Sequence, residues 1–118
     1  MKRDMDLIRE ILLEIEKLPP NTETGEFPIE GWKPEEINYH IRLLCQAGYV
    51  DAISVAAMGD DEWIVRSLTW NGHEFLEASR NQTLWNKAKA LVAEKGSGLT
   101  LEVLKAALIK VSLSQISL

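Results

Sequence analysis

The sequence predicts a mainly α-helical α+β fold with one small β-hairpin. Apolar residues recur at helical spacing in several separate segments of the 118-residue chain. One central stretch, residues 49–68, is instead rich in β-branched residues on either side of a turn signal. Prolines and glycines stand at the ends of these segments, where they stop helices and form turns. The length is that of one ordinary domain.

Two helices are expected in the first part of the chain. Residues 4–18 place their apolar side chains on one helical stripe, with Asp4 as the N-cap and two prolines after the last turn. A second helix is expected over residues 34–47, because proline suits the first helical position and Gly48 suits the left-handed cap after the last one. Between the two helices, residues 27–29 predict a short edge strand.

A β-hairpin is expected next. Residues 49–55 and 63–68 predict its two strands, and the Gly-Asp-Asp sequence at residues 59–61 predicts a turn between them. With Glu62, this turn gives the hairpin an acidic tip.

The remainder of the chain is expected to be helical. Thr69 or Asn71 can cap a helix that starts near Gly72 and breaks near residues 80–83. Residues 84–94 and 100–114 predict two more helices, which Gly-Ser-Gly at residues 96–98 separates.

The order helix, short strand, helix, hairpin, helices suggests a winged helix-turn-helix, in which the hairpin is the wing. Residues 41–50 (IRLLCQAGYV) and 68–76 (LTWNGHEFL) resemble the segments that lead into and out of the wing in winged-helix regulators. We expect residues 1–80 to form the winged-helix core and residues 81–118 a C-terminal helical extension of the same compact domain. Fifteen residues separate the first two helices, so the customary helix before the recognition helix is expected to be reduced to a turn.

Particular residues fit this arrangement. Gly48 allows the sharp exit from the second helix into the first strand, and Thr69 caps the helix after the hairpin. Gly72 is expected to avoid steric bulk close to the sheet.

Nearly the whole chain also resembles a family of short, uncharacterised proteins from phages, prophages and bacterial genomes. The resemblance is carried by the opening MKRDMDLIR at residues 1–9, by LTWNGHEFL at residues 68–76 and by the Trp-Asn-Lys sequence at residues 85–87. The family has no known function, so the resemblance implies no catalytic residues and no ligand. It implies a bacterial or phage origin and a cytoplasmic location.

Charge and cysteine content restrict the function classes. The formal net charge is -5 and the pI is near 5.0, which disfavours nucleic-acid binding because phosphate attraction comes from clustered Lys and Arg. The single cysteine, Cys45, cannot form an internal disulfide, and this suits a reducing compartment. The first residues are charged where a signal peptide would turn apolar, and no apolar run approaches the ~20 residues of a membrane span. A cytoplasmic protein without membrane association is expected.

No pattern of residues indicates an enzyme, a cofactor or a metal site. His40 and His73 have no Cys or His at metal-ligand spacing, so both are expected to be structural. No nucleophile–base pair stands out, and no glycine-rich phosphate loop is present.

The helix over residues 34–47 would be the recognition helix of a DNA-binding transcriptional regulator. The DNA-contact candidates are residue types that read base edges or contact phosphates: Asn38, Tyr39, Arg42 and Gln46 on this helix and Arg66 on the hairpin. Double-stranded DNA is one possible partner. The alternative is an acidic winged-helix protein-interaction module that does not bind DNA, because the acidic residues near this helix and at the hairpin tip would repel phosphates.

Four tryptophans are many for this length, and most are expected to fill the core and its edges. Trp32 in a loop and Trp63 at a strand start are the better candidates for a binding surface.

The last expected helix is apolar nearly all round, which predicts burial on more than one side. One stripe is assigned to a homodimer interface and consists of Leu101, Leu104, Leu108 and Val111. The alternative is that this helix packs only on its own domain.

Overall fold

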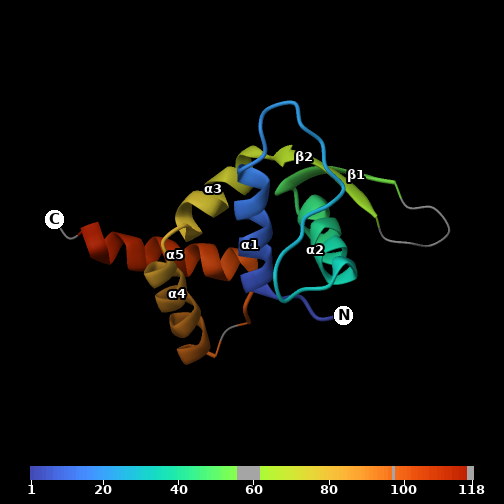
Figure 1. Ribbon diagram of the computed structural model, residues 1–118. Coiled ribbons are helices and arrows are strands. Elements are labelled where there is room, and N and C mark those ends of the chain that lie inside the picture. The colour runs from blue at the N-terminus through green and yellow to red at the C-terminus, as the bar shows by residue number, and fades with distance from the viewer. Residues whose placement is uncertain (56–61, 97, 117–118) are drawn as a thin grey trace. The chain divides into compact units, whose positions relative to one another are not determined.

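The computed structural model describes residues 1–55, 62–96 and 98–116, and it confirms the mainly helical α+β fold with one hairpin (Figure 1). In chain order the elements are α1 (Met5–Glu16), α2 (Pro34–Gln46), β1 (Val50–Ser54), β2 (Trp63–Leu68), α3 (Trp70–Ser79), α4 (Gln82–Glu94) and α5 (Leu101–Ile116). The turn expected at residues 59–61 lies outside the described residues. None of the described helices is long and apolar enough to cross a membrane.

The chain divides into two compact units, Met1–His73 and Glu74–Leu118. The division falls inside α3, several residues before the boundary expected at residue 80. The first turn of α3 therefore belongs with the hairpin, because Thr69 and Gly72 tie that turn to the backbone between α2 and β1.

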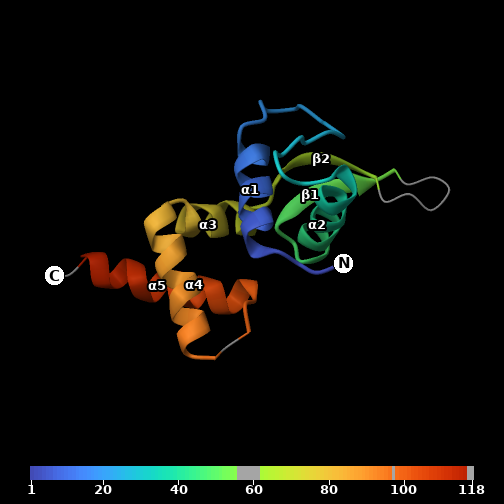
Figure 2. The same ribbon diagram turned by 60° about the horizontal axis from the view of Figure 1, so that its bottom comes forward.

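The core of the first unit is built on α1. Asp4 caps this helix as expected, since its carboxylate accepts the backbone N–H of Leu7 at 3.0 Å. The apolar stripe of α1 is almost completely buried and packs against α2 and β2. Figures 1 and 2 show α1 and α2 beside one another, and in Figure 1 the strands lie across the upper ends of these helices. Ile37, Ile41 and Leu44 form the buried face of α2, as the spacing predicts.

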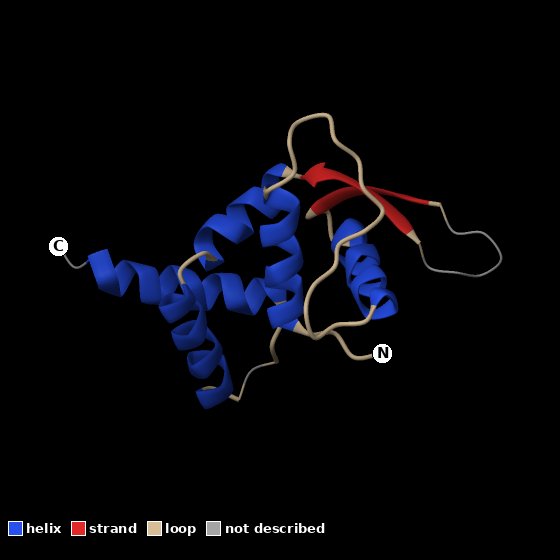
Figure 3. Ribbon diagram, viewed as in Figure 1, coloured by secondary structure: helices blue, strands red, loops and turns tan. Residues whose placement is uncertain are grey.

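The hairpin pairs β1 with β2 in antiparallel register, and one β-bulge leaves Arg66 without a partner on β1. The segment between α1 and α2 is drawn as a tan loop in Figure 3, and it adds one isolated β-bridge to the hairpin. In this bridge Thr24 exchanges backbone hydrogen bonds of 3.1 and 2.8 Å with Val65. The edge strand expected at residues 27–29 is therefore wrong. Thr24 can both donate and accept in the ladder, whereas Pro28 has no N–H to donate.

The exit from the hairpin confirms three of the expected residue roles. Gly48 has a positive φ of 81°, as the left-handed cap after α2 requires. The Thr69 hydroxyl donates to the Gly48 carbonyl at 2.6 Å and accepts the N–H of Gly72 at 3.1 Å. A Cβ on Gly72 would collide with the carbonyl oxygen of Tyr49, so this position requires glycine.

The second unit is a set of capped helices. Asn81 caps α4 through the N–H of Leu84 at 3.0 Å, so the chain breaks between α3 and α4 where expected. Thr100 caps α5 through the N–H of Val103 at 3.1 Å. Phe75 and Trp85 are fully buried and meet edge to face, with ring centroids 6.2 Å apart.

Candidate functional site

Four of the five DNA-contact candidates lie on α2. Asn38, Tyr39 and Arg42 are half-buried, and Gln46 is exposed at the C-terminal end of the helix. The Arg42 guanidinium carbon stands 5.2 Å from the centre of the Tyr39 ring, so these two side chains stack on one another. This stacking gives α2 a combined cationic and aromatic surface.

Arg66, the fifth candidate, lies on the bulge of β2. Its Nε donates to Oε1 of Glu23 at 3.1 Å, and both side chains are about half exposed. Such a surface ion pair adds little stability, but it places a carboxylate directly beside the guanidinium. Glu23 therefore weakens the positive potential that Arg66 would offer to a phosphate.

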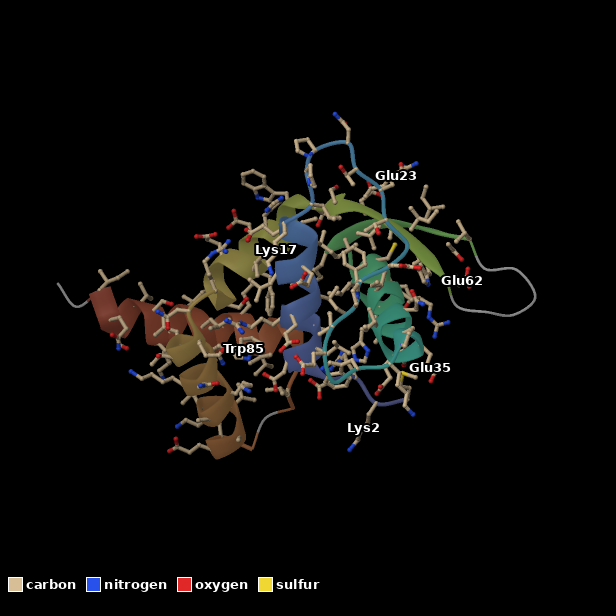
Figure 4. The ribbon with its side chains drawn as sticks, viewed as in Figure 1. Lys2, Lys17, Glu23, Glu35, Glu62 and Trp85 are labelled. Carbon is tan, nitrogen blue, oxygen red and sulfur yellow. The ribbon has the colours of Figure 1, made fainter. Side chains whose placement is uncertain are left out.

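The two units differ in charge. Met1–His73 contains fourteen acidic and seven basic residues, whereas Glu74–Leu118 contains four acidic and six basic residues. Figure 4 shows Glu23 on the loop, Glu35 at the start of α2 and Glu62 before β2 at the periphery of the first unit. One of the seven basic side chains, Arg9, is buried, and this burial lowers the pKa of its guanidinium. The α2 surface therefore belongs to a strongly acidic unit.

His40 is a structural residue, as expected. It is 1% exposed, and its Nε2 accepts the backbone N–H of Asp4 at 2.9 Å. Nδ1 therefore carries the proton of a neutral ring and donates to the carbonyl oxygen of Glu36 at 2.7 Å. The imidazole thus joins the N-terminus of α1 to the first turn of α2. Among the described residues, no group of three or more His, Cys, Asp and Glu could hold a metal ion.

Replacing His40 with alanine is expected to lower the free energy of unfolding by about 2 kcal/mol, because the N–H of Asp4 and the carbonyl of Glu36 lose their partner. The midpoint of urea unfolding, followed by far-UV circular dichroism, measures this loss. His73→Ala is the matched control. His73 was also expected to be structural, but its side chain is exposed, so this change should alter stability by less than about 0.5 kcal/mol. Equal midpoints for the two variants would contradict the structural role of His40.

A pocket of about 630 Å³ lies between α2 and the segment that precedes it. Its apolar lining comes from Phe27, Pro28, Ile29 and Trp32 in the loop and from Ile37 and Ile41 on α2. Glu26, Glu30 and Asn38 are polar members of the lining. All of these residues belong to the first unit, and Asn38 is the one that the pocket shares with the predicted DNA-contact face.

Sequence reasoning missed this pocket, although one of its signals was available. Trp32 is half-buried and lines the pocket, in agreement with its selection as a binding-surface candidate. Trp63 is half-buried on β2, and Trp85 is fully buried. Trp70 is 77% exposed and does not fill the core. The further signal for the pocket is the run of apolar residues in the loop before α2, Phe27, Pro28 and Ile29.

The predicted dimer stripe on α5 is buried inside the single chain. Leu101, Leu104 and Leu108 are at most 8% exposed, and Val111 is half-buried. Leu101, Leu104 and Leu108 fill this core, so Val111 is the one member of the stripe with side-chain surface left for a second copy. The large apolar side chains that are exposed on α5 are Ile109, Leu113 and Ile116. Helical spacing does not distinguish these two faces, because both are apolar. Self-association stays a prediction.

The chain is similar to an uncharacterised protein of Haemophilus influenzae. The two are 38% identical over 107 residues, which cover 89% of this chain and 90% of the relative. No solved structure matches the chain.

A family model described as "Hypothetical protein (DUF2513)" matches residues 2–98. The matched segment includes the first unit apart from Met1, continues past the end of α4, and stops before α5 begins. The expectation of an uncharacterised family is thereby confirmed, and the chain belongs to the DUF2513 family of hypothetical proteins.

Proposed function

We propose that this chain is a non-catalytic, winged-helix-like protein-interaction module of the cytoplasm. Its acidic first unit, in this proposal, binds a basic segment of a partner protein. The order of elements in Met1–His73 supports the winged-helix comparison. The edge at Thr24 takes the place of the short strand before the recognition helix, and the hairpin takes the place of the wing. Association with phage genomes stays a prediction.

The observation that carries the proposal is the charge of the first unit. A DNA-binding surface neutralises phosphates with several Lys or Arg residues around its recognition helix. Here α2 has one basic residue, Arg42, and two acidic ones in its first turn, Glu35 and Glu36. Arg66 on the hairpin is paired with Glu23. This distribution disfavours contact with a polyanion and favours a cationic polypeptide.

Fluorescence anisotropy with two labelled probes tests the proposal. One probe is mixed-sequence duplex DNA, and the other is a pool of short peptides with lysines around randomised apolar residues. We expect the peptide pool to bind with an affinity that salt weakens, and the DNA to stay unbound even at low salt. Arg42→Ala should leave peptide binding unchanged.

The opposite result would identify a DNA-binding regulator. In that case DNA binds at low salt, the affinity falls steeply as salt rises, and Arg42→Ala weakens it. The amide side chains of Asn38 and Gln46 on α2 would then be the next candidates for base contacts.

A further inference from the structure

We infer that the pocket between residues 25–34 and α2 binds one large apolar side chain of a partner peptide, and that Glu26 and Glu30 bind lysine or arginine residues on either side of it. This inference rests on the proposed function and assigns the binding site of that module. It concerns only the first unit, to which all of the lining residues belong.

The apolar part of the pocket has a buried floor and half-buried walls. Ile37 and Ile41 of α2 are 5% and 1% exposed and form the floor. Phe27, Ile29 and Trp32 are half-buried and form the walls. The volume of about 630 Å³ is within the range of about 300–1,000 Å³ that is usual for binding pockets. A leucine, phenylalanine or tryptophan side chain from a partner would cover this apolar surface.

The charge of the rim indicates what flanks that side chain. Glu26 and Glu30 are both exposed, and they stand at the two ends of the Phe27–Pro28–Ile29 wall. No lysine or arginine is among the lining residues in the described part of the chain. Two carboxylates without a neighbouring cation in the lining create a negative potential that favours a basic peptide and repels an acidic one.

Two features of the pocket, its open side and the amide of Asn38, favour a peptide over a free small molecule. Glu26, Pro28, Glu30 and Pro34 are exposed, so an occupant stays open to solvent along one side, where a peptide chain can enter and leave. Asn38 is half-buried in the lining, and its side-chain amide can donate to and accept from a peptide backbone.

The pocket is held in shape from both ends. Before it, Thr24 is paired with Val65 of β2. Within it, the Trp32 N–H donates to the Ile29 carbonyl at 3.2 Å, which closes a turn. After it, the Lys33 N–H donates to the Glu36 carboxylate at 3.0 Å in a capping interaction. Because the walls are already ordered in the free protein, binding does not carry the entropy cost of ordering them.

The test is an NMR titration of the whole chain, labelled with nitrogen-15, with a short peptide that has a central leucine between lysines. We expect the largest shifts at the Trp32 indole N–H and the Asn38 side-chain amide, while the buried Trp85 indole stays unchanged as an internal control. A peptide with central alanine should bind about tenfold more weakly, because a methyl group covers less apolar surface of the pocket than an isobutyl group does. A peptide with glutamates in place of the lysines should not bind.

A pair of matched variants separates the pocket from the general charge of the unit. Glu26→Lys with Glu30→Lys should weaken the leucine peptide at least about tenfold. Asp51→Lys with Glu62→Lys makes the same change in net charge at exposed positions outside the lining, and it should weaken binding less than about threefold.

Each outcome has a distinct meaning. If lysine peptides bind but shift residues outside 25–41, or if both double variants weaken binding equally, the pocket assignment is overturned and the interaction module stands. If no lysine peptide binds while duplex DNA does, the proposed function itself is overturned, and the pocket assignment with it.

Discussion

Replacing Gly72 with alanine is expected to lower the free energy of unfolding by about 3 kcal/mol, the upper part of the range for overpacked sites. The added Cβ would overlap the carbonyl oxygen of Tyr49 and would stand 3.1 Å from the Tyr49 carbonyl carbon and 3.4 Å from Leu68 Cβ. The first of these neighbours is backbone, which cannot move aside as a flexible side chain can.

Hydrogen bonds on both sides of the collision prevent relaxation. The Thr69 N–H donates to the same Tyr49 carbonyl at 3.1 Å, and the Thr69 hydroxyl holds Gly48 and Gly72 at once. Moving the first turn of α3 away from Tyr49 would therefore break the cap of α3 and the end of the hairpin together. The loss of stability in Gly72→Ala is therefore the smaller of two energies, the energy of this rearrangement and the energy of the steric overlap.

The midpoint of urea unfolding for Gly72→Ala measures the loss, and Gly25→Ala is the matched control in the same unit. A Cβ at Gly25 would meet its nearest atom, the Trp63 carbonyl oxygen, at 3.7 Å, which is ordinary contact. Its φ lies outside the left-handed region, so alanine there should be neutral or stabilising by up to about 1 kcal/mol. Similar stability of the two variants would show that the approach of Gly72 to Tyr49 is not essential.

The features that the sequence predicted correctly are those that local chemistry determines. The stripe on α1, the cap at Asp4 and the left-handed position at Gly48 each depend on residues within a turn or two of one another. Gly72 was also predicted correctly, although the atom that its missing side chain avoids, the carbonyl oxygen of Tyr49, lies on the other side of the hairpin. The hairpin itself followed from β-branched residues on both sides of a turn.

The errors concern contacts between distant parts of the chain. Thr24 pairs with Val65 across more than forty residues, and no local pattern distinguishes Thr24 from the more apolar residues 27–29. The pocket is missed for the same reason, because it forms only when the loop folds back on α2. On α5, the buried Leu104 and the exposed Leu113 are equivalent in sequence terms, and tertiary packing alone separates them.

Replacing Trp85 with alanine is expected to have the largest effect of any single change in the second unit, a loss of about 4 kcal/mol in the free energy of unfolding. Trp85 is fully buried on α4, and its ring packs edge to face with the ring of Phe75 on α3, with ring centroids 6.2 Å apart. The ammonium of Lys89 stands 5.8 Å from the centre of the same ring. Alanine would remove all of these contacts and leave a cavity the size of an indole.

Trp70→Ala is the matched control, because it removes the same side chain at a position that is 77% exposed and should cost less than about 0.5 kcal/mol. Far-UV circular dichroism is the appropriate probe, since both changes alter tryptophan fluorescence directly. A large loss for Trp85→Ala with Trp70→Ala unchanged would locate the packing centre of the second unit at the junction of α3 and α4. If Trp70→Ala lowered the free energy of unfolding more than Trp85→Ala did, the assignment of Trp85 to the core and Trp70 to the surface would be wrong. If Trp70→Ala leaves the free energy of unfolding unchanged, the exposed ring is not needed for stability. Any loss of binding in that variant would then be a direct effect on recognition.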